Sequence, residues 1–327
     1  MSPNRRRQLL ILGASALAPL RLALAQQSKL PRVGFLAARS REAAVEIAPF
    51  LEGMREFGYV EGKNIRYEWR FADGDYKRLR SLADELVALK VDVIAASSTP
   101  SVRAAQQATK TIPIVMLSAV DPVKMGFVAS LAQPGGNITG VSNMNEGTWQ
   151  KQVDLLVETV PKLSRVAVVL NPAEAFSELA RKEIDTAAKR HKLALSWVHA
   201  TSAQEIDQAF ATIKQERSQA LVIAGGASFV QWRRQLVALA AQARLPTIYY
   251  RRDYVEAGGL MSYGRNPALG YRRAAIYVDK ILKGAKPADL PIDQASVIEL
   301  VLNQTAAKLL GITFPGKVLV RADKIID

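Results

Sequence analysis

Short apolar segments alternate along the chain with segments whose apolar residues recur every three to four positions. Val33–Ala37, Val91–Ala96 and Ile112–Leu117 are apolar runs without polar alternation, which predicts strands covered on both faces. Residues 65–71 alternate between apolar and charged side chains and predict a half-exposed strand. Residues 76–89 carry their leucines at helical spacing and predict an amphipathic helix.

A second series of the same kind begins near residue 149. Repeated strand–helix units of this length are typical of parallel sheets with helices on both faces. Because the series occurs twice in 327 residues, we expect an α/β protein with two Rossmann-like lobes joined by a multi-strand hinge. The second series predicts strands at 165–170, 193–199, 220–224, 246–250 and 259–263, and helices at 149–160, 173–191, 204–214 and 230–244.

Glycine-rich turns mark where the chain is expected to cross between the lobes. Pro134–Asn137 precedes a strand at 138–142, and Tyr263–Pro267 precedes a helix that we expect to return to the first lobe. A late strand at 297–302 would carry a third crossing, and three crossings would form a hinge that closes around a ligand. The expected boundaries are 1–25 for a signal peptide, 26–141 plus 264–296 for the N-terminal lobe, and 142–263 plus 297–327 for the C-terminal lobe.

The first residues have the pattern of an export signal. Arg5, Arg6 and Arg7 precede a short apolar run, and Ala23-Leu24-Ala25 supplies a small-x-small site, so we expect cleavage after Ala25. The apolar run is shorter than the roughly 20 residues of a membrane span. The arginines fit either a twin-arginine or a Sec signal. We therefore expect a soluble product in the periplasm.

Composition narrows the function classes. The chain has no cysteine, which excludes disulfides, cysteine nucleophiles, thiolate zinc sites and a lipid-modified cysteine after the signal. It has two histidines, too few for a histidine-rich metal site. Cleavage after Ala25 would remove four arginines and no acid, lowering the formal net charge from +14 to +10. The remaining basic residues are scattered along helices without aromatic neighbours, so they do not indicate a nucleic-acid partner.

The sequence lacks the motifs of common α/β enzymes. Residues 37–40 (AARS) stand where a dinucleotide fingerprint would follow the first strand, and neither a phosphate loop nor a G-x-S-x-G elbow is present. His191 lies in a basic helix end and His199 ends a strand, positions that favour solvated histidines over a catalytic base. We therefore expect no enzyme activity, no cofactor and no metal.

Polar and small residues recur where the predicted strands end. In open parallel sheets, ligands lie beyond the carboxyl ends of the strands. Ser98 and Thr99 lead into a helix, with Thr99 as the expected N-cap and Pro100 as the first helical residue; this start would either hold an anion or simply cap the helix. We expect a ligand site in the cleft formed by Ala38, Arg39, Ser97, Ser98, Thr99, Ser118, Ala119, Asp121, Asn143, Asn171, Gly225, Gly226, Ser228 and Asp253.

Several of these positions allow two interpretations. Asp121 could pair with a ligand ammonium or cap a turn before Pro122. Gly225-Gly226 could let backbone amides approach a ligand or could only make a tight loop. Arg39, with Arg251 and Arg252, could select an acidic ligand; we interpret these arginines as charges on the rim.

Long segments of the chain resemble a known family. DPVKMGFVASLAQPGGNITGVS (121–142), EAGGLMSYGRN (256–266), YRRAAIYVDKILKGAKPADLPID (271–293), ELVLNQTAAKLLGITFP (299–315) and the terminal VLVRADKIID are similar to the tryptophan-binding-protein-like family of ABC transporter substrate-binding proteins. The resemblance covers nearly the whole chain after the signal. It implies a type I periplasmic-binding fold, ligand capture by closure, and delivery to a membrane permease with a separate ATPase.

The resemblance also implies roles for residues in the cleft. Relatives bind amino acids, especially aromatic ones. If this chain binds its ligand in the same way, the Ser98-Thr99 helix start would hold the carboxylate of the amino acid, and Asp121 or Asp253 would hold its ammonium group. Arg265 stands where relatives commonly have proline in the SYGPN turn, a difference that we interpret as changing hinge stiffness and not ligand choice.

The sequence therefore predicts a monomeric periplasmic solute-binding protein of an ABC transporter that captures a small carboxylate-bearing ligand, an aromatic or branched amino acid. The alternatives are a ligand-sensing periplasmic domain for a signalling partner and a two-lobed α/β enzyme such as a glycosyltransferase. A repressor-like ligand domain would share the fold, but no helix-turn-helix pattern precedes Val33.

Overall fold

The computed structural model describes residues 30–44, 47–143, 147–174, 176–294 and 297–327. The predicted signal peptide, residues 1–25, lies outside these ranges, as does the side chain of Asn143. No helix within the described ranges is long and apolar enough to cross a membrane. All the strands and helices below belong to one unit, Pro31–Asp327.

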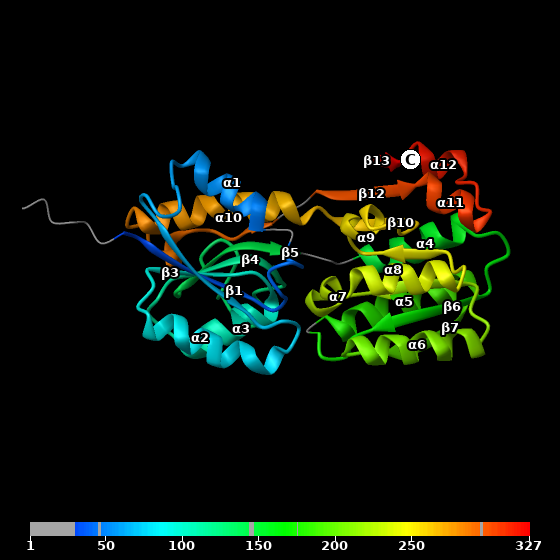
Figure 1. Ribbon diagram of the computed structural model, residues 1–327, viewed down its shortest axis with the longest axis horizontal. Helices are drawn as coiled ribbons and strands as arrows, with labels where there is room; N and C mark the ends of the chain where they lie inside the picture. Colours follow the sequence, from blue (N-terminus) through cyan, green and yellow to red (C-terminus); the bar gives the residue numbers. More distant parts are fainter. Residues whose placement is uncertain (1–29, 45–46, 144–146, 175, 295–296) are drawn as a thin grey trace, which may run out of the picture. The chain divides into compact units, whose positions relative to one another are not determined.

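The first sheet is parallel. Within the described ranges its strands lie in the order β11-β5-β4-β3-β1-β2, and neighbouring strands run in the same direction (Figure 1). The central strands β3 and β1 are buried on both faces, whereas the edge strand β2 is half-buried, as its alternating sequence predicts. The bounds are β1 Arg32–Ala37, β2 Arg66–Phe71, β3 Val93–Ala96, β4 Ile114–Val120, β5 Ile138–Asn143 and β11 Asp293–Gln294.

The second sheet is mixed. Its described strands lie in the order β13-β12-β10-β9-β8-β6-β7, and β12 runs antiparallel to β10 while the other neighbouring pairs are parallel. The predicted α/β class with helices on both faces is confirmed, with this one antiparallel pair added. The bounds are β6 Arg165–Leu170, β7 Ala194–His199, β8 Ala220–Ala224, β9 Thr247–Tyr249, β10 Met261–Arg265, β12 Ile298–Asn303 and β13 Lys324–Ile326.

Helices cover both faces of each sheet. In the first, α1 and α10 pack on one face and α2 and α3 on the other (Figure 1). In the second, α4 and α5 pack on one face and α6, α8 and α9 on the other. We call the first sheet with α1, α2, α3 and α10 the first lobe, and the second sheet with its helices the second lobe. The longer helices are α1 Ile47–Glu56, α2 Leu79–Ala88, α3 Thr99–Ala108, α4 Thr148–Thr159, α5 Ser177–His191, α6 Ala203–Gln215, α8 Arg233–Gln242 and α10 Pro267–Leu282. The shorter helices are η1 Tyr76–Arg78, α7 Ala227–Gln231, α9 Arg252–Glu256, η2 Pro287–Asp289, α11 Gln304–Leu310 and α12 Gly316–Leu319.

Two predicted helices are interrupted. The helix expected at 230–244 is divided into α7 and α8 at Trp232, whose backbone leaves the helical region (φ −102°, ψ 19°) while its ring packs on Phe229. The helix expected at 76–89 begins as the 3₁₀ turn η1, because the Asp75 side chain accepts the backbone N–H of Lys77 and tightens the first turn.

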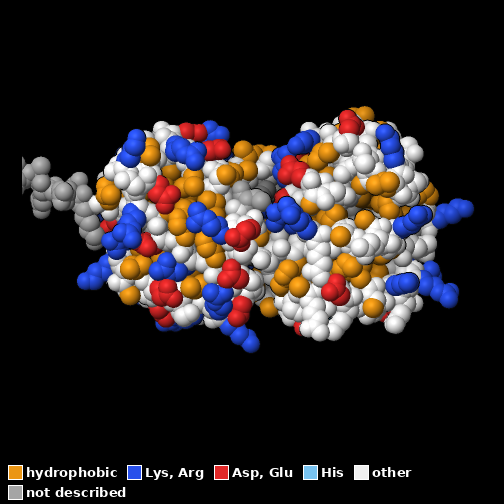
Figure 2. All heavy atoms as spheres, in the orientation of Figure 1, with side chains coloured by type: hydrophobic (Ala, Val, Ile, Leu, Met, Phe, Trp, Pro, Cys, Tyr) orange, Lys and Arg blue, Asp and Glu red, His pale blue; other side chains and the backbone are white. Residues whose placement is uncertain are grey.

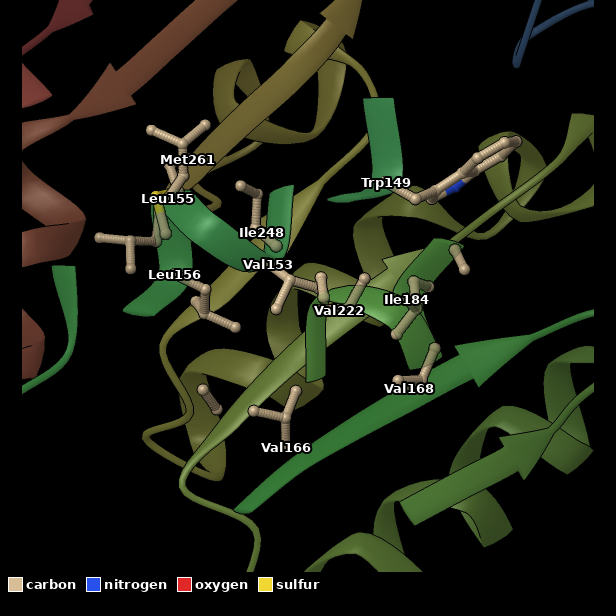
Figure 3. Close-up of a cluster of buried hydrophobic side chains, with 14 of the residues drawn as sticks. Trp149, Val153, Leu155, Leu156, Val166, Val168, Ile184, Val222, Ile248 and Met261 are labelled. Carbon is tan, nitrogen blue, oxygen red and sulfur yellow. The ribbon is translucent and has the colours of Figure 1, made fainter. Parts of the chain in front are cut away.

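The hydrophobic core of the second lobe shows how periodic sequence becomes packing. Val153 and Leu156 on one face of α4 meet Val168 of β6 and Ile184 of α5 (Figure 3). All four are fully buried, which stabilises the fold by about 1.5–3 kcal/mol per side chain. Trp149, in the first turn of α4, lies at one end of this cluster.

The sheets extend slightly beyond the predicted lobe boundaries. β5 carries the first sheet to Asn143, two residues past 141, and β10 carries the second sheet to Arg265, two residues past 263. The chain then returns to the first lobe through α10 and re-enters the second sheet at β12. The division of the chain into two separately moving domains stays a prediction.

Close contact between α1 and α10 depends on Gly53. A Cβ at this position would lie 2.7 Å from the Arg272 carbonyl oxygen and 2.8 Å from the Ala275 Cβ. Both neighbours belong to α10, so glycine sets the distance between the two helices.

We predict that Gly53→Ala lowers the free energy of unfolding by about 2 kcal/mol, because overpacking outweighs the better helix propensity of alanine. Urea denaturation would measure the change. Gly316→Ala in α12 is the matched control, since no described heavy atom outside its chain neighbours and its own helix backbone lies within 4 Å of the added Cβ. The stability of this variant should be unchanged or slightly raised. Equal stability of Gly53→Ala and the wild type would contradict this account of the helix contact.

Candidate functional site

A cavity lies between loops that follow strands of both sheets. It encloses about 820 Å³ of space not occupied by protein atoms, a volume that includes open solvent at its mouth. Ser97 and Ser118 line it from the first lobe, following β3 and within β4. Gly225 and Gly226 line it from the second lobe, directly after β8. The predicted site at the strand ends therefore coincides in part with a real cavity.

The first lobe contributes the start of α3. Ser98, and not Thr99, is the N-cap: its Oγ accepts the Ser101 N–H and lies 2.9 Å from the Ser101 Oγ. Thr99 is the first helical residue, and its Oγ1 accepts the Val120 N–H at 3.0 Å, which ties the helix start to β4. The predicted cap was wrong by one residue because Thr99 has this alternative partner in a neighbouring strand.

Ser97 lies at the base of this helix start. The residue is 1% exposed and lines the cavity, and its Oγ has no hydrogen-bond partner among the described residues. Its carbonyl oxygen accepts a hydrogen bond from the Tyr271 hydroxyl at 3.2 Å, so α10 fixes the backbone here. A buried hydroxyl without a partner costs free energy unless a bound molecule completes its hydrogen bonds.

The Gly225-Gly226 turn makes room for two side chains. A Cβ at Gly225 would lie 2.1 Å from Tyr250 Cε1, and one at Gly226 would lie 2.0 Å from Glu174 Cδ. The Tyr250 hydroxyl also donates to the Gly226 carbonyl oxygen at 2.6 Å. The glycines are therefore needed for the packing of Tyr250 and Glu174, which both line the cavity.

Glu174 is a buried carboxylate in the cavity wall. It is 4% exposed, lies in the loop after β6, and accepts hydrogen bonds at Oε1 from the Tyr76 hydroxyl (2.5 Å) and the Ser228 hydroxyl (3.3 Å). Asn171 donates to the Ser228 Oγ at 2.9 Å and orders the same loop. Asn171 and Ser228 thus act behind the cavity, supporting a residue that the sequence did not identify.

Hydrogen bonds also connect the two lobes beside the cavity. Tyr76 of the first lobe donates to Glu174 and accepts the Ser228 N–H at 2.9 Å. The Ser40 N–H donates to the Gln231 Oε1 of α7 at 2.8 Å. These contacts hold the lobes together along one side of the site.

Two arginines that we interpreted as rim charges are buried. Arg39 is 2% exposed and Arg251 is 9% exposed, and both line the cavity. Arg251 Nε and Nη2 donate to the two carboxylate oxygens of Asp253 at 2.9 and 3.2 Å. Arg252 points elsewhere, to Glu256 and Glu299. The rim interpretation was wrong for Arg39 and Arg251, since the sequence does not reveal how deep a loop side chain lies.

Positively charged neighbours lower the pKa of Asp253. Burial by itself would raise the pKa of Asp253, but the Arg251 guanidinium, aided by Arg39 and Arg233, more than offsets it. The pKa of this carboxyl therefore lies below its usual value and Asp253 is ionised at neutral pH.

Aromatic side chains form the apolar part of the wall. Trp149 and Phe176 stack with their ring centroids 5.4 Å apart, and both line the cavity with Tyr250 and Tyr271. Gln152 lies one helical turn beyond Trp149; its Nε2 donates to the Tyr263 carbonyl oxygen at 2.8 Å. Trp149 and Tyr271 were visible in the sequence only as members of apolar helix faces, which hid their second role.

Three more predicted site residues, Ala38, Ala119 and Asp121, lie away from the lining. Ala38 and Ala119 are fully buried in the core of the first lobe. Asp121 accepts the Lys124 N–H and forms an ion pair with Lys124, so it closes its own turn. Asn143 ends β5, and its side chain lies outside the described residues. Arg265 lines the cavity, and burial lowers its pKa; its effect on hinge stiffness stays a prediction.

The histidines lie outside the cavity lining. His191 Nε2 lies 2.7 Å from Asp154 Oδ1, and His199 Nε2 lies 3.0 Å from Arg181 Nη2. The part of the chain that the structure describes contains no group of three or more histidines and acidic residues placed to hold a metal ion. On the face shown in Figure 2, basic and acidic side chains are interspersed and do not form a single basic patch.

Comparison with known proteins decides the family. The family model described as "ABC transporter substrate binding protein" matches residues 35–326. The chain belongs to this family. The resemblance seen in the sequence is thereby confirmed, and the protein is an ABC transporter substrate-binding protein and not an enzyme.

Individual substrate-binding proteins are similar over most of their length. A tyrosine-binding protein of Clostridioides difficile (strain R20291) is 28% identical over 262 residues, covering 80% of this chain and 75% of the relative. An ABC domain from Streptococcus pneumonia in complex with L-Trp is 26% identical, with a TM-score of 0.82 over 91% of this chain and 100% of the other. The ligand-free, open structure of a substrate-binding protein with adhesive properties from Clostridium difficile is 25% identical, with a TM-score of 0.62 over 91% and 99%. The type I periplasmic-binding fold of the family is confirmed.

We predict that Asp253→Asn lowers the free energy of unfolding of this substrate-binding protein by about 3 kcal/mol at pH 7, because it leaves Arg251 buried without its ionised partner. The pKa of Asp253 is depressed in the folded state, so its contribution is complete above about pH 4, the unfolded value, and is lost as the pH falls through the folded value. The difference between variant and wild type should therefore shrink at lower pH.

Urea denaturation at pH 7 and pH 3 would measure both effects. Asp84→Asn is the control, since Asp84 forms an exposed pair with Arg80 one helical turn away and should change stability by less than about 1 kcal/mol. A pH-independent difference for Asp253→Asn would contradict the ion-pair account.

Proposed function

We propose that this protein is exported to the periplasm, where, as a monomer, it captures an aromatic or branched amino acid in the cavity and delivers it to a membrane permease. The observation that carries the proposal is the cavity itself, in which a helix start with a buried, unsatisfied serine hydroxyl faces aromatic side chains. The signal-like pattern of residues 1–25 supports export.

The first lobe offers a site for the ligand carboxylate. The N-terminus of α3 carries the positive end of the helix dipole, and Thr99 and Ser97 line the cavity there. The Ser97 hydroxyl would complete its hydrogen bonding by donating to the carboxylate.

The second lobe offers an apolar surface for the side chain. Trp149, Phe176 and Tyr250 present aromatic rings to the same cavity. Aromatic pairs contribute about 0.5–1.5 kcal/mol beyond their buried area, which favours a flat, apolar side chain. The relatives described as tyrosine-binding and as a complex with L-Trp support this ligand class.

The arrangement of the lobes supports capture by closure. The TM-score is 0.82 to the L-Trp complex and 0.62 to the ligand-free, open structure, so the lobes are arranged more like the ligand-bound relative. A ligand that contacts both lobes stabilises the closed state by its differential affinity.

We predict that L-tryptophan, L-tyrosine, L-phenylalanine or L-leucine raises the melting temperature of residues 26–327, refolded from denaturant to remove any bound molecule. At about 100 times its dissociation constant a ligand contributes about 2.7 kcal/mol, a shift of roughly 5 °C. Tryptamine and tyramine lack the carboxylate and should give no shift. Stabilisation by sugars or nucleosides and by none of the amino acids would overturn the proposed ligand class.

A substitution at Ser97 would locate the site. Ser97→Ala should weaken binding of the stabilising amino acid about tenfold or more in titration calorimetry, since a hydrogen bond to a charged group is lost. Ser262→Ala is the matched control: the Ser262 Oγ is also buried without a partner among the described residues, but it does not line the cavity. Equal affinities of both variants would place the carboxylate elsewhere.

Delivery to a permease is testable in cells. Deletion of the gene should abolish uptake of the radiolabelled amino acid, and a plasmid copy should restore it. Normal uptake in the deletion strain, with loss of a ligand-dependent signalling response, would favour the sensory alternative.

A further inference from the structure

A second pocket lies in the second lobe, near the amino ends of β9 and β10. It encloses about 720 Å³ of space not occupied by protein atoms, a volume that includes open solvent at its mouth. Leu245 and Leu260 line it where the chain enters β9 and β10, whereas the cavity described above follows the carboxyl ends of strands. Helices α8 and α11 contribute the other walls. The described residues that line one of the two sites do not line the other, so the second pocket is separate from the cavity.

The interior of the second pocket is apolar. Val237 and Ala240 of α8, Leu260 and Ala306 line it, and each is no more than 9% exposed. Leu309 of α11 also lines the pocket but is 78% exposed, so it lies at the mouth. A bound apolar group would remove surface of this leucine from water, which is favourable.

Contacts on both sides of a tyrosine ring fix the shape of the second pocket. Tyr249 is 1% exposed and lines the pocket, and its ring stacks on Tyr254 with the centroids 4.8 Å apart. On another side, a Cβ at Gly259 would lie 2.6 Å from the Tyr249 Cε2. Thr247, also in the lining, donates its hydroxyl to the Leu245 carbonyl oxygen at 2.8 Å. The pocket is therefore preformed, which lowers the cost of binding.

The charge at the second pocket is positive. Arg244 is the only charged residue in the lining that the described residues form, and it lies exposed just after α8. Its guanidinium is not needed to cap the helix, because the backbone N–H groups of Arg244 and Leu245 already donate to the carbonyl oxygens of Ala241 and Ala240. An arginine at the mouth of an apolar pocket attracts an anion and repels a cation.

We propose that the second pocket binds a small monoanion with an apolar body, of the kind represented by a medium-chain carboxylic acid. The apolar body lies against Val237, Leu260 and Leu309, and the anionic group pairs with Arg244 at the mouth. This site goes beyond the proposed function, and either can fail without the other because the two sites share no lining residue.

Two probes with the same apolar body and opposite charges test the site. Decanoate and decylammonium are titrated by calorimetry at neutral pH into residues 26–327, refolded from denaturant. The wild type should bind decanoate about tenfold or more tightly than decylammonium, because the first is attracted by Arg244 and the second is repelled.

Arg244→Gln should reduce this preference by about fivefold, since it removes the charge and keeps much of the length of the side chain. Arg217→Gln is the paired control. Arg217 follows α6 with nearly the same backbone conformation (φ 54° against 51° at Arg244), and it lies outside the lining of the second pocket. Its substitution should leave the preference unchanged.

A change of side-chain size locates the bound molecule. Ala241 of α8 is exposed and lines the second pocket, so Ala241→Trp should fold normally and weaken decanoate binding about tenfold or more by occupying the mouth. Ala238 is exposed on the same helix and lies outside the lining. Ala238→Trp should therefore bind decanoate as the wild type does. The ligand-free melting temperatures of both variants verify that they fold.

Loss of decanoate affinity in Ala241→Trp and not in Ala238→Trp, together with loss of the charge preference in Arg244→Gln, would support the proposal. Absence of decanoate binding to the wild type would overturn it. Equal affinities of the two tryptophan variants would also overturn it, because decanoate would then bind elsewhere, for example in the cavity between the lobes. A full preference for decanoate in Arg244→Gln would overturn the assignment of the anionic group to Arg244.

Discussion

The direction of the strands is the constraint from which the site follows. In a parallel sheet every strand ends at the same edge, so the residues that come after β3, β6 and β8 are collected at the edges of their sheets. When two such sheets are connected through β5, α10 and β12, these edges can face a common cavity. Ser97 from one sheet and Gly225 from the other meet there, although they are far apart in the sequence.

The predictable part of the structure is the part that follows from local chemistry. Unbroken apolar runs such as 93–96 predict buried strands because a strand covered on both faces has few polar positions. The serines at 97 and 98 could be assigned to the site because the rule for strand ends needs only the strand. The break at Trp232 could not be predicted from the sequence, since it accompanies the packing of the Trp232 ring on Phe229. The antiparallel direction of β12 could not be predicted either, because it depends on which strand β12 pairs with after the last crossing.

The part of the site that escaped prediction is the part made by tertiary contacts. Glu174 lies beyond the end of β6, where a loop residue has no periodic pattern, and its partner Tyr76 is separated from it by almost a hundred residues. Arg39 and Arg251 were placed near the cleft by their strands, but nothing in the local sequence indicates that both are buried. The sequence shows how far a residue lies from the end of its strand, whereas the depth of its side chain below the protein surface follows only from the folded structure.

The same contacts explain why a site of this kind requires both lobes. The Glu174 carboxyl is 4% exposed and depends on hydrogen-bond donors in place of water, and one of these donors, Tyr76, belongs to the other lobe. Separation of the lobes would replace that donor by water. In the proposed capture by closure, the surroundings of this carboxyl would therefore change together with the shape of the cavity.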